Sequence, residues 1–318
     1  MIRTRFAPSP TGFLHVGGLR TALFAYLFAR KNKGVFVVRI EDTDQKRFVE
    51  GGIENMIRSL RWAGITIDEG TDVEDSATII QKGNFGPYIQ SERLGFYERH
   101  ANDLLEREQA YYCFCRAERL AELRQYQELN KLATGYDGRC RTIFAGEAKG
   151  RVKDSEPHVI RLKMPREGTT KFTDLIRGEV EFPNKTIDDQ ILMKSDGFPT
   201  YHLANVVDDH LMAITHVIRG EEWLPSTPKH IILYQMFGWE VPRFAHLSLL
   251  VNEQKQKLSK RHGDVSVEDF KAKGYLPEAL VNFVAFLGWN PGDEREFFTL
   301  KELEQEFSLE KVAKTSAV

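Results

Sequence analysis

Two short segments of the chain combine residue types that bind and transfer phosphate groups. The first, RFAPSPTGFLHVGG (residues 5–18), carries a single histidine, His15, followed by Gly17 and Gly18. Glycines let the backbone approach a ligand closely, and the free N–H groups at a helix start attract anions. The segment is therefore typical of a phosphate-binding loop, although a rigid strand-to-helix turn with an incidental histidine is the alternative.

The second segment, KLSKR (residues 257–261), places three cations, Lys257, Lys260 and Arg261, within five residues. A mobile basic loop of this kind can close over a triphosphate and stabilise the charge that builds up during phosphoryl or nucleotidyl transfer. An isolated basic run is more often a solvated turn. Together with a glycine-rich loop after the first strand, it favours a nucleotide-binding site.

The elements around the first segment predict how it is positioned. A short apolar run precedes it, and a helical pattern follows, with apolar residues at the spacing of one helix face: Leu19, Ala22, Leu23, Tyr26 and Leu27. Residues 35–40 are β-branched and apolar, which predicts a second strand. A strand–loop–helix–strand unit indicates an open parallel sheet, whose ligands bind at the carboxyl ends of the strands.

The rest of the chain predicts an α/β core that is interrupted and then followed by helices. We expect a polar loop at 68–82, short strands and hairpins between about 110 and 203, and further core strands at 214–219 and 245–251. Helices are expected at 267–273, 276–287 and 300–307. The predicted division is a Rossmann-like catalytic domain in two halves (1–108 and 198–253), an α+β insertion (109–197), and the KLSKR loop with a helical module (254–318).

Composition narrows the class of protein. The 318 residues carry a net charge of −2 and are 42% hydrophobic, with no run of 18 apolar residues and no signal-peptide core at the N-terminus. Three cysteines, an odd number, argue against a disulfide framework and fit a reducing cytoplasm. Because the sequence has no long apolar run, we expect no membrane partner. Any nucleic-acid contact must come from a local basic patch.

The motifs resemble those of a known family. PSPTGFLHVGG is similar to the first signature of class I aminoacyl-tRNA synthetases, and KLSKR to the second. The resemblance to bacterial glutamyl-tRNA synthetases extends over essentially the whole chain, through RIEDTD, GPYIQSERL, YDGRCR, FPTYHLANVVDDH, VIRGEEWL and GYLPEALVNFVAFLGWNPG. It implies activation of L-glutamate by ATP with Mg²⁺ to a glutamyl-adenylate, and transfer to the 3′ end of glutamate tRNA in translation. It also implies that the insertion binds the tRNA acceptor end, that the helical module contacts the tRNA stem, and that the protein is a monomer.

The resemblance assigns roles to matching positions. The catalytic residues would be His15, Lys257 and Lys260. ATP would be bound by His15, Gly17, Gly18, Glu222, Trp223, Lys257 and Lys260. L-glutamate would be bound by Arg5, Ala7, Ser9, Glu41, Tyr201, Asn205 and Arg219. A guanidinium can pair bidentately with a carboxylate and Glu41 can hold the substrate ammonium, whereas a neutral glutamine would leave an arginine unpaired.

The cysteines match only part of a zinc motif. Cys113, Cys115 and Cys140 correspond to three of the four zinc ligands of some family members, but Thr142 stands where the histidine is expected. Tyr136 could be the fourth ligand, as in a shorter paralogue. Because three ligands make a poor structural zinc site, the sequence favours free buried cysteines, and the metal stays unknown.

Three alternatives remain open. That paralogue glutamylates queuosine in aspartate tRNA and lacks an anticodon-binding domain. A tRNA-independent nucleotidyltransferase would share the first loop, and an inactive binding protein would share only the fold. The module after Gly263 and the intact signatures favour the glutamyl enzyme. Since the chain ends in an apolar run at 316–318, we expect the chain to be cut before an anticodon-binding domain.

Overall fold

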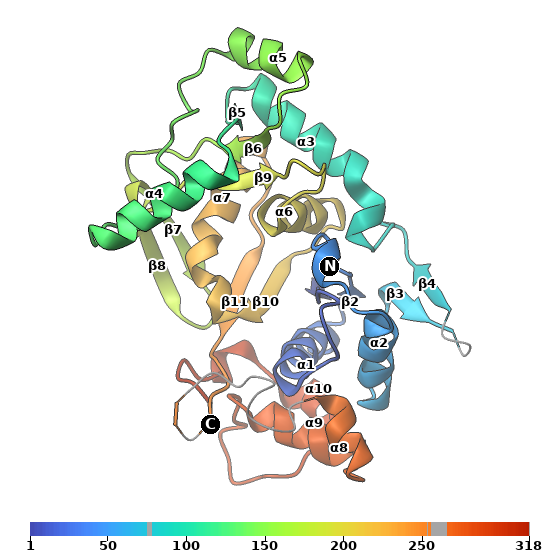
Figure 1. Ribbon diagram of the computed structural model, residues 1–318. Coiled ribbons are helices and arrows are strands. Elements are labelled where there is room, and N and C mark those ends of the chain that lie inside the picture. Colours follow the sequence, from blue (N-terminus) through green and yellow to red (C-terminus); the bar gives the residue numbers. More distant parts are fainter. Residues whose placement is uncertain (75–77, 253, 256–265, 318) are drawn as a thin grey trace.

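The fold is organised around an eight-stranded sheet in the order β4-β3-β2-β1-β10-β11-β7-β8 (Figure 1). It comes from a computed structural model that describes residues 1–74, 78–252, 254–255 and 266–317. The strands are β1 (Arg3–Phe6), β2 (Val35–Val38), β3 (Glu69–Val73), β4 (Ile79–Lys82), β7 (Thr169–Asp174), β8 (Gly178–Pro183), β10 (His216–Gly220) and β11 (Arg243–Leu247).

The connections between the strands change direction beside β1. Strands β3, β2, β1, β10, β11 and β7 are parallel, and only the outermost strands β4 and β8 are antiparallel to their neighbours. The chain continues from β1 to β2 on one side, and it returns much later to β10 on the other. In open parallel sheets such a change of direction marks the ligand site, which is therefore expected at the carboxyl ends of β1 and β10. The predicted parallel α/β core is confirmed.

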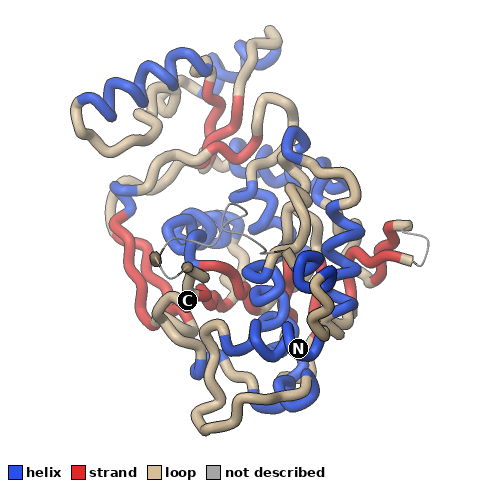
Figure 2. Tube along the Cα trace, turned by 60° about the horizontal axis from the view of Figure 1, so that its bottom comes forward, coloured by secondary structure: helices blue, strands red, loops and turns tan. Residues whose placement is uncertain are grey.

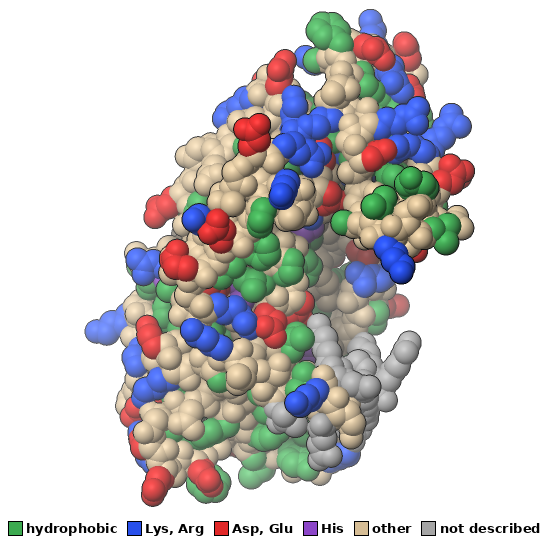
Figure 3. All heavy atoms as spheres, turned by 90° about the vertical axis from the view of Figure 1, so that its left-hand side faces the viewer, with side chains coloured by type: hydrophobic (Ala, Val, Ile, Leu, Met, Phe, Trp, Pro, Cys, Tyr) green, Lys and Arg blue, Asp and Glu red, His purple; other side chains and the backbone are tan. Residues whose placement is uncertain are grey.

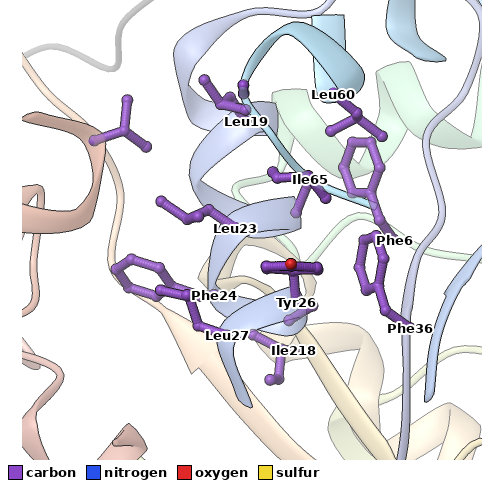
Figure 4. Close-up of a cluster of buried hydrophobic side chains, with 14 of the residues drawn as sticks. Phe6, Leu19, Leu23, Phe24, Tyr26, Leu27, Phe36, Leu60, Ile65 and Ile218 are labelled. Carbon is purple, nitrogen blue, oxygen red and sulfur yellow. The ribbon is translucent and has the colours of Figure 1, made fainter. Parts of the chain in front are cut away.

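Alternating residues of the strands bury both faces of the sheet. Phe36 and Val38 belong to the core under α1 (Val16–Lys31), whereas Val37 between them faces the opposite side. Figure 4 shows the α1 side, where apolar side chains of the helix meet those of the strands. The helix is buried almost all round, because α9 (Pro277–Phe286) and α10 (Leu300–Glu306) pack on the side that the sheet leaves open. Helix α2 (Gly52–Trp62) packs beside β3, and α6 (Tyr201–Leu211) and α7 (Thr227–Phe237) lie on the opposite side of the sheet from α1 (Figure 1).

The segment between α3 (Leu94–Glu106) and α6 contributes to two sheets. A separate three-stranded sheet is formed by β5 (Ala110–Cys113), β6 (Val159–Leu162) and β9 (Ile191–Met193), with α4 (Ala117–Leu129) and α5 (Ala145–Lys153) beside it. Figure 2 shows its strands at the top, apart from the central ones. The hairpin of β7 and β8 instead extends the main sheet, since Asp174 of β7 pairs with Phe244 of β11.

Three short helices, α8 (Val267–Ala272), α9 (Pro277–Phe286) and α10 (Leu300–Glu306), follow the α/β core, as the periodicity predicts. Ser266 and Thr299 start α8 and α10 with capping boxes. The module packs on α1, where the rings of Phe24 and Phe307 lie 5.0 Å apart. Short 3₁₀ helices occur at Gln45–Arg47, Gln90–Arg93, Asn184–Thr186, Glu221–Ser226 and Leu309–Lys311.

Two local predictions are wrong. The polar segment at 68–82 contains β3 and β4, because pairing with β2 and ion pairs from Arg61 and Lys82 to Asp72 stabilise strands of low intrinsic propensity. The end of the segment between about 110 and 203, where short strands and hairpins are expected, forms no strand at 198–203: only Pro199 pairs with Met193, and α6 begins at Tyr201. Among the described residues no helix is long and apolar enough to cross a membrane.

Candidate active site

The loop after β1 is held by backbone contacts to the segment after β2. The carbonyl of Pro8 accepts from Glu41 N–H at 2.9 Å, and that of Pro10 accepts from Val49 N–H at 2.9 Å. The N–H of Leu14 donates to the side chain of Asn55 at 3.1 Å. Because each proline restricts its own backbone and the carbonyls are engaged, the loop has little freedom to move.

His15 is exposed and is the N-terminal cap of α1. Its Nδ1 accepts from the N–H of Gly18 at 3.1 Å, so in the neutral ring the proton lies on Nε2. That nitrogen can donate to an anionic oxygen. The first turn of α1 carries no acidic residue, so its free N–H groups and the helix dipole also favour an anion here.

Gly17 and Gly18 leave room for this arrangement. A Cβ atom on Gly17 would lie 3.1 Å from the His15 ring, and one on Gly18 would lie 2.9 Å from Cδ1 of Leu14. Side chains at either position would therefore displace the cap or its neighbour.

The segment that carries Lys257 and Lys260 falls outside the described residues, but both of its ends are placed. Val251 donates to the carbonyl of Ala317 at 2.9 Å, and Val267 donates to the carbonyl of Leu14 at 2.9 Å. His15 and Ser266 also form a single antiparallel bridge. The chain therefore re-enters the described structure directly beside the histidine.

The predicted amino-acid site divides into two groups of buried residues. In the first, Arg5 donates to Asn205 at 3.3 Å and to Asp209 at 3.2 Å. Arg39 donates to the same aspartate at 2.7 Å and to Glu41 at 3.0 Å. Burial raises the pKa of Glu41, against the lowering effect of Arg39 and Arg5. An alternating chain of cations and anions thus joins two predicted residues, Arg5 and Glu41, through Asp209 and Arg39, and Asn205 adjoins it as a neutral acceptor for Arg5.

The second group surrounds Arg219 with neutral side chains. Its guanidinium donates to Tyr201 at 3.1 Å, to Thr227 at 2.9 Å, to His246 at 3.1 Å and to His230 at 3.3 Å. Burial lowers the pKa of His230 well below its usual value. Among the described residues no carboxylate lies within ion-pair distance of Arg219.

The remaining predicted residues lie around these groups. Ala7 is half-buried and Ser9 is exposed on the loop after β1. Trp223 covers Tyr201, with ring centroids 4.0 Å apart. Glu222 is exposed and lies against the backbone of Gly220, where a Cβ would meet its carboxylate at 2.0 Å.

The sequence motifs do not reveal the residues that hold these groups in place. They are the buried polar side chains Arg39, Asp174, Asp209, Thr227, His230 and His246. One signal was available: Arg39 interrupts the apolar run VFVVRI, and a charged residue inside a buried strand requires an internal counterion.

The cysteines form a compact cluster in the small sheet. The sulfur atoms of Cys113, Cys115 and Cys140 all lie within 4.8 Å of one another. The hydroxyl of Tyr136 lies 3.3 Å from Cys113 Sγ and 3.5 Å from Cys115 Sγ, and Cys115 Sγ lies 3.5 Å from Cys140 Sγ. Three sulfur atoms and one phenol oxygen thus lie close together, and the Tyr136 hydroxyl also accepts from the N–H of Cys140 at 2.9 Å.

Comparisons with known proteins show which proteins the chain is similar to. The family model described as tRNA synthetases class I (E and Q), catalytic domain, matches residues 1–318. The chain is similar to glutamate–tRNA ligases of Clostridioides difficile (strain 630) and Alkaliphilus metalliredigens (strain QYMF), at 56% and 55% identity over 317 residues. The alignments cover 100% of this chain but 64% of either relative, so the chain spans less than two thirds of their length.

A solved structure shares the fold. The glutamate tRNA ligase from Elizabethkingia meningosepticum CCUG26117, in complex with its amino acid, superimposes with a TM-score of 0.90 at 42% identity. The match covers 99% of this chain and 66% of that one.

Proposed function

We propose a function on the premise that the chain belongs to the family of class I tRNA synthetases (E and Q), whose catalytic-domain model it matches throughout. The protein activates L-glutamate with ATP to glutamyl-adenylate and transfers the glutamyl group to the 3′ end of glutamate tRNA. Relatives named glutamate–tRNA ligase, at 55–56% identity, support this assignment.

The observation that carries the amino-acid specificity is the environment of Arg219. A buried guanidinium with only neutral partners keeps its full charge for an incoming anion. L-glutamate supplies a side-chain carboxylate for it, and glutamine does not. Tyr201 lies beside Arg219 and contacts the same carboxylate. The rest of the amino acid is bound by five residues: Arg5, Ala7, Ser9, Glu41 and Asn205. Glu41 pairs with the α-ammonium group.

The nucleotide binds at the start of α1. His15 donates from Nε2 to a phosphate oxygen of ATP, and the backbone at Gly17 and Gly18 approaches the phosphates. Lys257 and Lys260 stabilise the departing pyrophosphate, with Mg²⁺ arriving on the ATP. Glu222 and Trp223 face the adenosine. In this arrangement the protein acts by orientation and electrostatics, without a covalent protein intermediate.

The tRNA is assigned to the inserted segment and the helices that follow the core. Arg116, Arg139, Lys149 and Lys153 are exposed there, and Figure 3 shows Lys and Arg side chains gathered at the top of this face. Cations at such a surface bind phosphates without reading sequence. We keep the four-part division at 108/109, 197/198 and 253/254, a monomeric state and a cytoplasmic location as parts of the proposal.

Pyrophosphate exchange tests the reaction. We expect glutamate-dependent ATP–pyrophosphate exchange that requires glutamate tRNA. Robust exchange without tRNA would favour the queuosine-modifying paralogue, and exchange that requires neither glutamate nor tRNA would favour a different nucleotidyltransferase.

The role of Lys260 has its own test. Lys260→Ala should abolish exchange while L-glutamate binding stays largely intact, because the lysine acts on the leaving group. Lys31→Ala, at the far end of α1, is the matched control and should retain exchange. Normal exchange by the Lys260 variant would refute the assignment.

The cysteine cluster fits a structural zinc ion better than the sequence indicated. Zinc–sulfur bonds of about 2.3 Å in a tetrahedron separate the sulfurs by roughly 3.8 Å, close to the 3.5 Å between Cys115 and Cys140. Tyr136 supplies the fourth donor whose absence argued against zinc. Burial raises the pKa of Cys115 to about 11, and zinc would displace the proton that such a thiol retains.

Metal analysis of the purified protein decides this point. We expect about one zinc per chain, with loss of the metal in Cys140→Ala and weaker retention in Tyr136→Phe, which keeps all three thiols. Failure to bind added zinc would restore the interpretation of free buried cysteines.

A further inference from the structure

The tautomers of the two histidines beside Arg219 can be deduced from geometry. A guanidinium has five N–H donors and no acceptor, so any imidazole nitrogen facing it carries no proton. The Nε2 of His246 lies 3.1 Å from Arg219 Nε, and the Nδ1 of His230 lies 3.3 Å from both terminal nitrogens. His246 must therefore carry its proton on Nδ1, and His230 on Nε2, which lies 3.1 Å from His202.

Asp174 accepts the proton that His246 carries. Its Oδ2 lies 2.6 Å from His246 Nδ1, and neither side chain is exposed to solvent. Burial opposes ionisation of Asp174, but the interactions with His246 and with the backbone N–H groups of Ile176 and Arg177 together outweigh burial and lower the pKa of the aspartate. Burial lowers the pKa of His246 despite its ionised neighbour. The pair is thus a carboxylate and a neutral imidazole.

The orientation of Asp174 is set by the backbone. Its Oδ1 accepts from the N–H groups of Ile176 and Arg177, at 3.0 Å each. The N–H of His246 lies 3.3 Å from Oδ1 and 3.2 Å from Oδ2. Since Oδ1 is engaged by the turn after β7, Oδ2 is the atom that faces the imidazole.

We propose that Asp174 and His246 are positioning residues for recognition of the substrate's side-chain carboxylate. Asp174 selects the tautomer of His246, and the bare Nε2 then fixes the plane of the Arg219 guanidinium. The negative charge lies one imidazole away from Arg219, so the cation is held firmly without being neutralised by direct contact. The inference rests on the proposed function, because it takes the anionic ligand to be L-glutamate.

This arrangement explains how a rigid arginine can still reject a neutral amide. A carboxylate in direct contact would satisfy Arg219 before the substrate arrives, and glutamine would then bind at little cost. Neutral acceptors orient the guanidinium and leave its charge uncompensated. Binding glutamine would keep that buried charge unpaired, which is the basis of strong discrimination.

Asp174→Asn is the sharpest test, because it should invert the tautomer. The two backbone N–H groups require an acceptor, so the new amide directs its oxygen to them and its NH₂ group to His246. The imidazole then accepts at Nδ1 and carries its proton on Nε2, where it opposes the N–H of Arg219. We expect the KM for L-glutamate in tRNA-dependent exchange to rise at least about tenfold, with a smaller change in kcat.

The tautomer itself is measured by the imidazole ¹⁵N shifts of histidine-labelled protein, with the His246 signals identified by their absence in His246→Gln. The wild-type protein should show the Nδ1–H form, and Asp174→Asn the Nε2–H form. Asp68→Asn is the control: Asp68 also accepts from a backbone N–H and an arginine, but on the other side of the sheet. It should change neither the tautomer nor the KM.

Substitutions of His246 provide a second test that does not depend on Asp174. His246→Gln retains an oxygen that can accept from Arg219, whereas His246→Leu leaves that N–H unpaired. The KM for L-glutamate should therefore rise more in the leucine variant than in the glutamine variant.

Several results would overturn the inference. An Nε2–H or protonated His246 in the wild-type protein would do so without any variant, and so would an inverted tautomer with an unchanged KM. If the wild-type protein shows no glutamate-dependent exchange in the presence of glutamate tRNA, the proposed function fails. The tautomer measurement is independent of that outcome and separates the two failures.

Discussion

Arg5 and Arg219 lie on the neighbouring parallel strands β1 and β10 and are almost equally buried, at 3% and 4% exposure. Arg5 belongs to a closed ionic network, in which three guanidinium groups meet three carboxylates: Arg5, Arg39 and Arg93 with Glu41, Asp208 and Asp209. Arg219 meets only neutral acceptors among the described residues.

The two groups differ in the source of the compensating charge. In the ionic network, each charge compensates another charge of the protein, so removal of one carboxylate leaves buried cations behind. Around Arg219, compensation is left to the ligand, so changes should affect binding more than folding. The comparison predicts a definite ranking of variants.

The largest effect on stability is expected for Asp209→Asn. This aspartate is shared by Arg5 and Arg39, and loss of its charge should lower the free energy of unfolding by about 3–5 kcal/mol. Urea denaturation measures the change. A loss no larger than that caused by Arg219→Gln would contradict the distinction between the two groups.

Arg219→Gln should have the largest effect on ligand binding. Truncating a buried charged partner costs at least about 2 kcal/mol, so the dissociation constant for L-glutamate should rise roughly 30-fold or more. The free energy of unfolding should change far less than in Asp209→Asn, since no carboxylate in contact loses its partner. Calorimetric titration with L-glutamate and urea denaturation provide the two values.

Glu41→Gln should have smaller effects, both on the free energy of unfolding and on the affinity for L-glutamate. The amide oxygen can still accept from Arg39, which retains Asp209, so the unfolding free energy should fall by less than about 2 kcal/mol. The affinity for L-glutamate should drop roughly tenfold, because the α-ammonium group loses an ionic partner.

The same variant isolates a pH dependence. Burial raises the pKa of Glu41, so Glu41 gains a proton, and loses its charge, at a higher pH than an exposed glutamate. As the pH falls towards that pKa, the affinity of the wild-type protein for L-glutamate should decline more steeply than that of Glu41→Gln. Parallel curves for the two proteins would show that Glu41 does not pair with the ammonium group.

The smallest effect is expected at an exposed ion pair. Asp44 contacts Arg47 at 2.6 Å, but both side chains are largely exposed. Asp44→Asn should leave the urea midpoint and the L-glutamate affinity unchanged, because solvent screens the pair. A clear loss of stability would show that the solvent exposure of an ion pair does not predict its contribution to the free energy of unfolding.

Much of the architecture was readable from periodicity. The spacing from Leu19 to Leu27 predicts α1, and the β-branched run from Val35 predicts β2, since both elements bury the surfaces that their patterns mark. The hairpin of β3 and β4 was missed because its residues are polar and the neighbouring strand stabilises it. Helix α6 was missed because aromatic residues at its start resemble a strand.

The site was predictable only in part. The motifs marked Arg5, His15, Glu41 and Arg219 as substrate-facing, but not the side chains that orient them. Tyr136 shows the same limit in the cysteine cluster: its position in the chain permits a fourth ligand, and only its placement 3.3 Å from Cys113 brings the donors together.

The sequence by itself determined the family, most helices and strands, and the two loops that carry the signatures, because these features depend on residue type and short-range spacing. The tertiary structure decided the partners. Arg39 meets Asp209 across 170 positions, and Asp174 meets His246 across 72. Such contacts depend on strand order and register, which a periodic pattern leaves open: it tells which side of an element a residue occupies, but not which distant residue lies opposite.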